Sequence, residues 1–595
     1  MCSISGIFSS EPGSANAVAR MNRAQRHRGP DDQGVFQDGR VVLGNTRLAI
    51  IDTSASGHQP MHDRHTGNWI TYNGETYNFK DLRKEIGGEW QSQTDTEVVL
   101  RAYGQWGVNA FSKMRGMFAL AIWEAKKETL VLARDPLGIK PLYYYRANNQ
   151  LVFASELRAL LASGLVPRRL STTGVDSYLA NGSVEAPLTI IDGVKQLLPG
   201  HYLQIAVDEL NEVEFASPEP QQVQGSRADA VARLRAELEE SVRLHLVSDV
   251  PLGVFLSGGM DSSALVALTS RITEQRPKTF SVVFDEPDFD EAPFSRDVAK
   301  RFNTDHSEIR LSENRLIEIL PQAIAAIDQP TMDGINTFVV SSAVKSAGVT
   351  VALSGLGGDE LFGGYPSFRR ALRFAAMSQT SKRLLRAASG VALNGSVKRH
   401  KFRQLMDSDG RPEDVYRISR QLFPVTQIRR TNGAEQVVDI VNAISRLELK
   451  GYMTNTLLRD TDVMSMAHSL EVRVPFVDLK VVDYVLSLPG DWKLRVKSGP
   501  KPLLVDAMAD LLPQEFMSRP KRGFVLPFEK WLQQNLRGEV LAVLDDKTRV
   551  EAVGLDSEFV AKVWRDFLRK PAAVGWSRPW AIYVLVKWCE LNDVG

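Results

Sequence analysis

The sequence predicts an α/β and α+β protein in which a sheet-rich N-terminal domain precedes an α/β domain with a parallel sheet and a helical end. Three patterns predict this fold. Short alternating or apolar runs separated by Gly, Asn and Asp continue to about residue 206, apolar runs alternate with helical patterns over 250–360, and the pattern from about Tyr365 is mostly helical. At roughly 100–200 residues per domain, the 595 residues leave room for two large domains or for several smaller ones.

The N-terminal part is expected to be mainly β-structure, with one helix at Thr94–Trp106. Its apolar runs are short and are bounded by residues that favour turns. The segments predicted as strands are 41–52, 68–78, 117–125 and 128–135.

A polar stretch at 207–230 separates the two parts, and it is predicted to be a terminal strand that runs into a linker. The predicted domains are therefore residues 1–210 and 231–595, joined by a linker at 211–230. A helix is predicted over 228–246. The apolar runs that follow it, at 250–256, 278–286 and 350–354, alternate with helical segments, which is typical of a parallel sheet.

Composition excludes several classes of protein. The chain has 72 Lys and Arg against 71 Asp and Glu, and this balance gives no indication of a nucleic-acid partner. The two cysteines, Cys2 and Cys589, are too few for a disulfide scaffold or a Cys-rich metal site, and Cys589 is expected to pack within a helix. With no apolar run long enough for a transmembrane segment and no signal-peptide pattern, a cytoplasmic location is expected.

Residues 361–406 carry ten Lys and Arg and no acidic residue, which distinguishes this segment from the balanced chain around it. Members of the set include Arg369, Arg370, Arg373, Lys382, Arg383 and Arg386. A solvated helical face is one interpretation. The other is a docking site for an anionic acceptor, a membrane surface or a partner.

Cys2 becomes the N-terminal residue if Met1 is removed, and an N-terminal cysteine supplies both a thiol nucleophile and an α-amino base, whose ordinary pKa is about 7.7–8. The segments that accompany it are RHRGPDDQG at 26–34, NTRLAIID at 45–52, YNGETYN at 72–78 and QTDTEVVL at 93–100. With these motifs the sequence resembles the class II, N-terminal-nucleophile glutamine amidotransferases. The resemblance implies a four-layer αββα glutaminase domain in which Cys2 attacks the glutamine amide.

The same resemblance assigns roles to the other motif residues. Asn73 and Gly74 provide the oxyanion hole, where charge develops in the tetrahedral intermediate. Arg47 and Asp95 grip the α-carboxylate and α-ammonium of glutamine, and Glu75 belongs to the same pocket. These roles suit the planar fork of an arginine and the fixed acceptor of an aspartate.

VFLSGGMDSS at 254–263 places a glycine-rich turn between an apolar strand and a helix that starts near Asp261, a combination suited to phosphate. It lacks the ending of a Walker A loop and resembles the pyrophosphate loop of N-type ATP pyrophosphatases, which implies a doubly wound α/β domain that adenylates its substrate. ALSGLGGDELFGGY at 352–365 is the second matching motif, so Asp261 and Asp359 are the expected Mg²⁺ ligands. Lys501 matches a lysine that neutralises the departing pyrophosphate or the adenylate. The residues expected at the ATP site are Leu256, Ser257, Gly258, Gly259, Asp261, Ser262, Val282, Ser354 and Gly355.

A third signature, MSMAHSLEVRVPFVD at 464–478, is interpreted as a helix-to-loop packing element in which His468 is structural. The whole chain then resembles the glutamine-hydrolysing asparagine synthetases, from Cys2 to the C-terminal helices. The resemblance implies glutamine, ATP and a carboxylate acceptor as small-molecule substrates, and a possible homodimer. It also implies an internal ammonia tunnel, with segments 134–145 and 153–161 near the domain junction.

Two positions depart from the asparagine-forming relatives. Leu356 stands where they usually have an acid that handles the ammonia proton, and Val463 stands where they tend to have Lys or Arg. The segment 328–338, which aligns with the acceptor pocket, contains Asp328 and Asp333 and no basic residue, although free aspartate favours a basic clamp.

Aspartate is therefore the default acceptor, and a uronic-acid sugar of a polysaccharide or a biosynthetic intermediate is the alternative. A different class of function, a non-catalytic scaffold or sensor that binds glutamine or ATP, also stays open.

Overall fold

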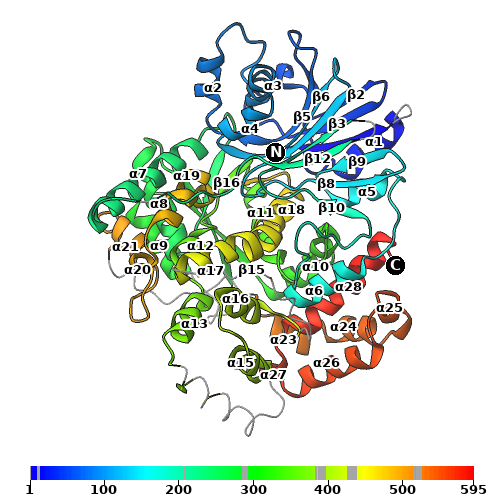
Figure 1. The fold of residues 1–595 in the computed structure, drawn as a ribbon. Helices are drawn as coiled ribbons and strands as arrows, with labels where there is room; N and C mark the ends of the chain where they lie inside the picture. The colour runs from blue at the N-terminus through cyan, green and yellow to red at the C-terminus, as the bar shows by residue number, and fades with distance from the viewer. Residues whose placement is uncertain are drawn as a thin grey trace.

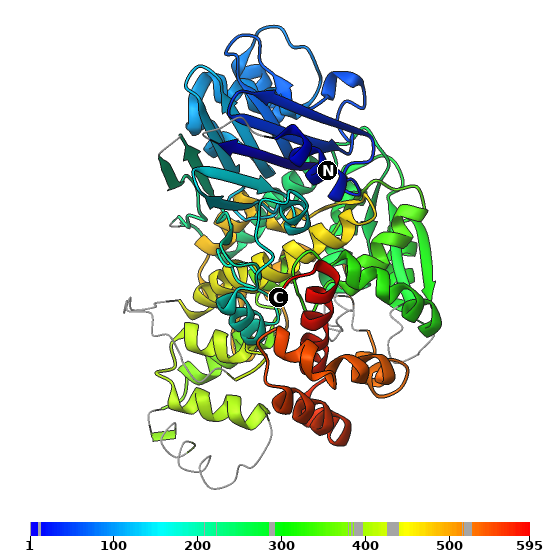
Figure 2. The same cartoon turned by 90° about the vertical axis from the view of Figure 1, so that its right-hand side faces the viewer.

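The computed structural model describes residues 2–9, 14–206, 209–221, 223–284, 292–378, 380–381, 385, 397–424, 439–513, 516 and 526–595. The basic residues Lys382, Arg383 and Arg386 lie outside these ranges. The two sheets of the N-terminal part occupy one end of the molecule, and the C-terminal helices occupy the other (Figures 1 and 2). Within the described ranges, no helix combines the length and apolar character that a membrane span requires.

Two antiparallel six-stranded sheets form the N-terminal domain. In order across the first sheet, the strands are β10 (Val194–Gln196), β8 (Tyr143–Ala147), β9 (Gln150–Ala154), β1 (Ser3–Ser9), β3 (Val41–Arg47) and β2 (Asp32–Asp38). In order across the second sheet, they are β12 (Leu210–Glu214), β11 (His201–Ile205), β7 (Thr129–Arg134), β6 (Gly116–Glu124), β5 (Trp69–Thr76) and β4 (Met61–His62). Because β12 belongs to this sheet, the sheet extends past the predicted limit at residue 210.

Alternation along β1 explains how the sheets stack. Ile4 and Phe8 point into the core between the sheets, whereas Ile7 points outward against Val18 of α1 (Ala15–Ala24). The helices around the two sheets are α1, α5 (Leu157–Ala162), α2 (Phe79–Ile86), α3 (Asp95–Trp106), α4 (Ala110–Lys113) and α6 (Thr172–Asn181). α1 and α5 cover the first sheet while α2 and α3 cover the second, so the domain has the expected four-layer αββα arrangement.

The C-terminal domain is built on a five-stranded parallel sheet. In order across it, the strands are β15 (Asp305–Leu311), β14 (Lys278–Phe284), β13 (Leu252–Phe255), β16 (Val351–Leu353) and β17 (Glu471–Arg473). The chain order reverses between β13 and β16. Ligands of open α/β sheets bind outside the carboxyl ends of the strands at such a switch point.

Helices cover both faces of this sheet, which confirms the doubly wound arrangement. Val254 of β13 packs with Leu238 of α7 (Arg227–His245) and Leu265 of α8 (Met260–Ile272), whereas Ala352 of β16 packs with Val344 of α11 (Ile335–Ser346). Each face of the sheet is therefore apolar, as a buried parallel sheet requires.

The rest of the described C-terminal domain is helical, as predicted. Its helices are α9 (Ala292–Arg301), α10 (Glu313–Ala326), α12 (Gly358–Phe362), α13 (Pro366–Ala375), α15 (Val397–Asp407), α16 (Pro412–Arg420), α17 (Ile440–Glu448), a π-helix (Leu449–Leu458), α18 (Arg459–Met466), α19 (Leu479–Ser487), α20 (Gly490–Lys493), α21 (Pro502–Ala507), α23 (Phe528–Gln533), α24 (Arg537–Leu544), α25 (Lys547–Ala552), α26 (Ser557–Arg569), α27 (Pro571–Val574) and α28 (Ser577–Asn592).

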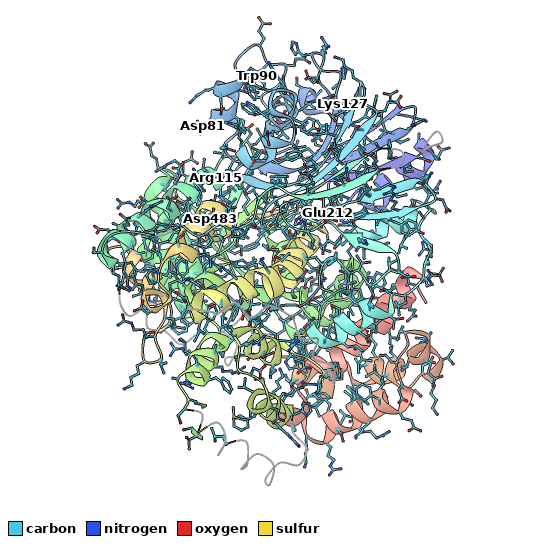
Figure 3. The ribbon with its side chains drawn as sticks, in the orientation of Figure 1. Asp81, Trp90, Arg115, Lys127, Glu212 and Asp483 are labelled. Atoms are coloured by element: carbon cyan, nitrogen blue, oxygen red, sulfur yellow. The ribbon has the colours of Figure 1, made fainter. Side chains whose placement is uncertain are left out.

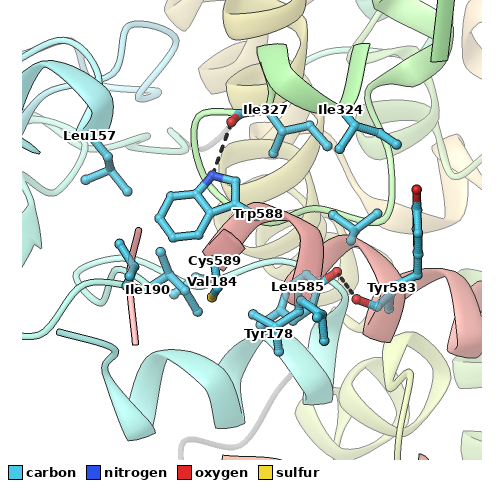
Figure 4. Close-up of a cluster of buried hydrophobic side chains, with 14 of the residues drawn as sticks. Leu157, Tyr178, Val184, Ile190, Ile324, Ile327, Tyr583, Leu585, Trp588 and Cys589 are labelled. Carbon is cyan, nitrogen blue, oxygen red and sulfur yellow. Dashed lines mark hydrogen bonds between the residues drawn. The ribbon is translucent and has the colours of Figure 1, made fainter. Parts of the chain in front are cut away.

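α28 anchors the C-terminal helices to the N-terminal domain. Tyr178 of α6 donates a hydrogen bond to the carbonyl of Ala581 at 2.8 Å, and Trp588 donates one to the carbonyl of Ile327 at 3.2 Å (Figure 4). Cys589 packs in the same cluster with 4% of its surface exposed, which confirms its expected place in a helix. Apolar burial together with these satisfied polar groups holds α28 against α6 of the N-terminal domain and against the segment that contains Ile327.

Some predicted elements differ from the observed ones. The strand predicted over 41–52 ends at Arg47, and the predicted helix-to-loop signature at 464–478 contains the strand β17. β17 has only three residues, of which Glu471 and Arg473 are charged, so it leaves no apolar pattern in the sequence. It forms because it pairs with β16 in the finished sheet.

The two domains also meet just before β6, an inner strand of the second N-terminal sheet. Arg115 lies at this junction, as Figure 3 shows, and its guanidinium contacts the Asp478 carboxylate at 2.8 Å. Asp478 also accepts a hydrogen bond from the backbone amide of Lys480 and caps α19. The domains are thus joined through polar contacts as well as through packing.

Candidate functional site

Cys2 lies immediately before β1, the strand that runs through the middle of the first sheet. The residue is 8% exposed, and its carbonyl accepts a hydrogen bond from Arg28 at 3.3 Å. Burial raises the pKa of the Cys2 thiol, while the Leu48 amide and the Arg47 guanidinium act in the opposite direction. A thiol in this setting needs a nearby base before it can act as a nucleophile.

Asn73 and Gly74 lie side by side in β5. Asn73 is fully buried, and neither polar atom of its side-chain amide has a hydrogen-bond partner among the described residues. A buried amide without partners is costly, so this group is available to a ligand. At Gly74 a Cβ atom would lie 2.4 Å from the carbonyl of Met117, so only glycine lets β5 pair this closely with β6.

Arg47 and Asp95 come from different elements and are both held in place by backbone groups. Arg47 ends β3 and donates to the carbonyls of Ser54 at 2.9 Å and Asp52 at 2.5 Å. Asp95 begins α3 and accepts a hydrogen bond from the Thr76 amide at 2.9 Å. Burial raises the pKa of Asp95 to about 6. Both charges act on the Cys2 thiol, so the fold brings the predicted glutamine-binding pair next to the predicted nucleophile.

Glu75 has a partner that the motif analysis did not assign. Its carboxylate lies 3.4 Å from the guanidinium of Arg473 in β17, which also contacts Glu471 at 2.6 Å. Burial raises the pKa of Glu75 well above its usual range, and Arg473 opposes this effect. Glu75 therefore faces the domain junction, and Arg473 links the strand of the Asn-Gly pair to the edge of the C-terminal sheet.

The nucleotide motifs meet where the C-terminal sheet reverses its chain order. Leu256 follows β13 and its amide donates to the carbonyl of Phe280 at 2.8 Å, while Ser354 follows β16 and its amide donates to the carbonyl of Arg473 at 2.8 Å. The predicted ATP-site residues that follow these strands are Leu256, Ser257, Gly258, Gly259, Ser354 and Gly355. Val282 lies near the end of β14, and Ser262 lies in the first turn of α8, where its hydroxyl is 3.0 Å from that of Ser257.

Lys501 joins the two predicted Mg²⁺ ligands. Its ammonium contacts Asp261, and it lies 2.6 Å from Asp359. Lys501 is 5% exposed; burial alone lowers its pKa, and the two carboxylates outweigh that effect and raise it. The ammonium of Lys501 thus lies between the two carboxylates. Carboxylate and phosphate oxygens are the ligands that Mg²⁺ prefers, so Asp261 and Asp359 suit this metal.

Glycines allow the side chains of Asp261, Asp359 and Lys501 to approach one another. A Cβ at Gly358 would lie 2.3 Å from Asp261, and one at Gly364 would lie 1.8 Å from Asp359. Larger residues at either position would displace the carboxylates. The glycines of the second motif therefore allow Asp261, Asp359 and Lys501 to converge.

The positions that depart from the asparagine-forming relatives lie in α18 and around the second nucleotide motif. Leu356 packs against the apolar core of the C-terminal domain, and Val463 is 5% exposed in α18. Asp333 accepts a hydrogen bond from the Tyr452 hydroxyl at 3.1 Å. Asp328 instead accepts from the backbone amides of Leu157 at 2.7 Å and Arg158 at 3.0 Å, so it binds the N-terminal domain.

His468 has a structural environment, in agreement with its interpretation. Its ring lies 4.3 Å from that of Phe338, and burial lowers its pKa. Motif analysis missed Arg28 and Arg473, although both lie inside quoted motifs. Nothing in a one-dimensional pattern marks an arginine whose partners come from another domain.

Comparison with known proteins agrees with this two-site organisation. The asparagine synthase family model matches residues 233–590, and the glutamine amidotransferase domain model matches residues 1–216. "Asparagine synthetase [glutamine-hydrolyzing] 1" of Bacillus subtilis is 31% identical over 100% of this chain and 97% of its own. "Asparagine synthetase [glutamine-hydrolyzing] 3" of the same organism is 33% identical over 85% of this chain and 83% of its own. "Amidase chyE" of Penicillium rubens is 27% identical over 93% of both chains.

Replacing Arg473 by methionine is expected to destabilise the protein, and the loss of stability should be larger at neutral pH than at acidic pH. Burial alone raises the pKa of Glu471, and Arg473 reverses this and holds that pKa below its usual value. Such a carboxylate stabilises the fold above its unfolded pKa, so removing its partner should cost about 3–5 kcal/mol near pH 7. The cost should shrink as the pH falls and Glu471 is protonated, which thermal unfolding midpoints measured across this range would detect.

Arg495→Met is the matched control, because Arg495 forms an exposed pair with Asp491 at 3.0 Å. It should change stability by about 0.5 kcal/mol or less. An Arg473→Met variant as stable as this control at neutral pH would show that the buried pair contributes little.

Proposed function

The chain belongs to the glutamine-hydrolysing asparagine synthetase family, and from this premise we propose how its own residues perform glutamine-dependent amidation. ATP is a substrate of this chemistry. Cys2, after loss of Met1, attacks the side-chain amide of glutamine with its own α-amino group as the base. Ammonia leaves, and water then hydrolyses the thioester to glutamate.

The observation that carries this proposal is the buried side-chain amide of Asn73, which has no hydrogen-bond partner among the described residues. A fixed donor in a dry site stabilises the oxyanion of the tetrahedral intermediate without reorganising. Arg47 and Asp95 hold the α-carboxylate and α-ammonium of glutamine. Gly74 contributes its backbone amide, and Glu75 is a positioning residue that acts through Arg473.

At the second site, an acceptor carboxylate oxygen attacks the α-phosphorus of ATP and pyrophosphate leaves. Ammonia then attacks the carbonyl carbon of the acyl-adenylate, AMP leaves, and a carboxamide forms. Asp261 and Asp359 would hold Mg²⁺, which when bound neutralises phosphate charge. Lys501 then moves its ammonium from these carboxylates to the phosphates, and the first turn of α8 binds phosphate through its backbone amides.

Aspartate is the default acceptor, by the names of the relatives. Leu356 and Val463 favour a second candidate, a carboxylate other than aspartate, because neither position supplies the acid or the base of the asparagine-forming pattern. Dimer formation, which the family resemblance implies, remains part of this proposal.

Acceptor-dependent release of pyrophosphate tests the proposal. Wild-type protein with ATP, Mg²⁺ and glutamine should release pyrophosphate and form an amide with aspartate, or with a nucleotide-linked uronate such as UDP-glucuronate. Cys2→Ala should lose glutamine turnover and keep synthesis driven by ammonium salts, because the two sites are separate. Loss of both activities in a folded Cys2→Ala protein would contradict two separable sites.

Glutamine affinity is expected to depend on the ionisation of Asp95. The pKa of this carboxyl is about 6, and only its charged form holds an ammonium, so KM for glutamine should rise about tenfold per pH unit below that value. The measurement is KM for glutaminase activity between pH 5 and 8, a range that extends about one unit below the pKa of Asp95 and about two units above it. Asp95→Asn should have a high KM that does not change over this pH range. A KM equal to that of the wild type in Asp95→Asn would show that Asp95 does not bind glutamine.

Lys501→Met is expected to increase the affinity for Mg²⁺ in the absence of nucleotide. The ammonium of Lys501 competes with a metal for Asp261 and Asp359, and its removal should tighten Mg²⁺ binding by about tenfold. Titration calorimetry with Mg²⁺ alone measures this without relying on activity. Lys497→Met, which removes an exposed lysine of the same loop, is the control. Equal Mg²⁺ affinity in all three proteins would argue against a metal at these carboxylates.

A further inference from the structure

A group of cations gathers around residues 419–423, at the end of α16. Lys401 of α15 donates a hydrogen bond to the carbonyl of Ser419 at 3.0 Å, and Arg578 of α28 donates one to the carbonyl of Leu422. Arg420 belongs to the segment itself. We name Arg370, Lys401, Arg420 and Arg578 the cationic cluster; Arg370 and Lys401 belong to the basic segment identified in the sequence.

Each of the three arginines lies close enough to Lys401 to repel its charge. The pKa of Lys401 is lowered to about 8, first by burial and then by the charges of Arg578, Arg370 and Arg420. These cations come from α13, α15, α16 and α28, so tertiary packing assembles them. Packing three or four like charges together is unfavourable unless an anion compensates them.

Among the described residues, a carboxylate pairs with one member of the cluster. Arg420 pairs with Glu448 at 2.5 Å, whereas no ion pair involves Arg370, Lys401 or Arg578 in the part of the chain that the structure describes. Arg578 is only 9% exposed, and its Nε atom is buried without a hydrogen-bond partner among the described residues. A buried, unsatisfied donor in a group of cations points to an anionic ligand.

Arg420 connects the cluster to the presumed acceptor pocket. Its guanidinium carbon lies 3.9 Å from the ring centre of Tyr452 and 4.3 Å from that of Tyr365. The Tyr452 hydroxyl binds Asp333 in the acceptor segment, and the Tyr365 hydroxyl donates to Glu360 at 2.6 Å, next to Asp359 in sequence. The rings of Tyr452 and Tyr365 thus connect Arg420 of the cluster to Asp333 and Glu360.

We propose that the cationic cluster binds a second anionic group of the acceptor, separate from the carboxylate that becomes the amide. This inference rests on the proposed function, because it takes the acceptor pocket to be the one beside Asp333. It also explains how a pocket segment with acids and no base can serve an anionic substrate: the basic residues come from α13, α15, α16 and α28. The group is a phosphate or a carboxylate, since Arg and Lys bind both.

Protection of Lys401 from acetylation tests the anion site without knowledge of the acceptor. Inorganic phosphate is the probe, and a non-hydrolysable ATP analogue with Mg²⁺ fills the nucleotide site so that phosphate cannot bind there. Acetylation of each lysine by an N-hydroxysuccinimide ester is followed by mass spectrometry. Saturating phosphate should slow acetylation of Lys401 about tenfold and leave the exposed Lys562 unaffected.

Arg370→Gln should weaken this protection, whereas Arg373→Gln, which removes an exposed arginine of the same helix, should retain it. The same experiment with succinate in place of phosphate distinguishes a carboxylate site from a phosphate site. Two results would overturn the proposal. One is equal acetylation of Lys401 with and without each anion, and the other is protection that Arg370→Gln leaves unchanged.

Kinetics with paired acceptors then test the link to the substrate. KM is measured in ammonium-driven pyrophosphate release for aspartate, UDP-glucuronate and glucuronate, of which glucuronate has no second anionic group. In the double variant Arg370→Gln/Lys401→Gln, KM for the acceptor with the second anion should rise about tenfold while kcat changes less. Arg373→Gln should have the KM of the wild type. An unchanged KM in the double variant would show that the cluster does not bind the acceptor.

Failure of this inference and failure of the proposed function give different results. If neither aspartate nor UDP-glucuronate is amidated, the proposed acceptors fail, while protection of Lys401 by phosphate still decides whether the cluster binds anions. If amidation proceeds and Lys401 is not protected, the proposed function stands and the anion site is wrong.

Discussion

Arg28 is the buried charge on which the junction of the two domains depends. It contacts the carbonyl of Cys2 at 3.3 Å, the carboxylate of Glu156 at 3.0 Å and the carboxylate of Asp462 at 2.7 Å, and its side chain is fully buried. Asp462 also pairs with Lys140 at 3.2 Å. Because a buried charge is tolerated only when its partners are fixed, this network holds α18 of one domain against the backbone of the proposed nucleophile in the other.

Arg473 places the same constraint at a second point of the junction. It connects Glu75, in the strand that carries Asn73, to Glu471 in the edge strand of the parallel sheet, and its carbonyl receives the amide of Ser354 in the second nucleotide motif. Arg473 thus contacts one residue of each proposed site, Glu75 through its guanidinium and Ser354 through its carbonyl. The arrangement suits a reaction in which ammonia must pass between sites without exposure to water.

Motif analysis could propose the two sites because the chemistry of each depends on short segments. Cys2 and the Asn73–Gly74 pair fall in short segments that carry the motifs, and the loop before Asp261 is a strand–turn–helix unit of a kind that suits phosphate. The fold class and the helix at 94–106 were also predictable, because hydrophobic period and turn residues encode them. The short strand β17 was not, because pairing with β16 rather than its own pattern makes it a strand.

The sequence by itself determined the family and the two proposed kinds of chemistry, a thiol nucleophile with an oxyanion hole and a phosphate loop with two carboxylates, since each proposal depends on residue type within a short segment. Only the tertiary structure decided which charges meet: Arg473 with Glu75, Lys501 with Asp261 and Asp359, and Arg578 with Lys401. These residues are far apart in the chain and come together through packing of apolar faces. The energy of a charge depends on its burial and its neighbours, and these exist only once the chain has folded.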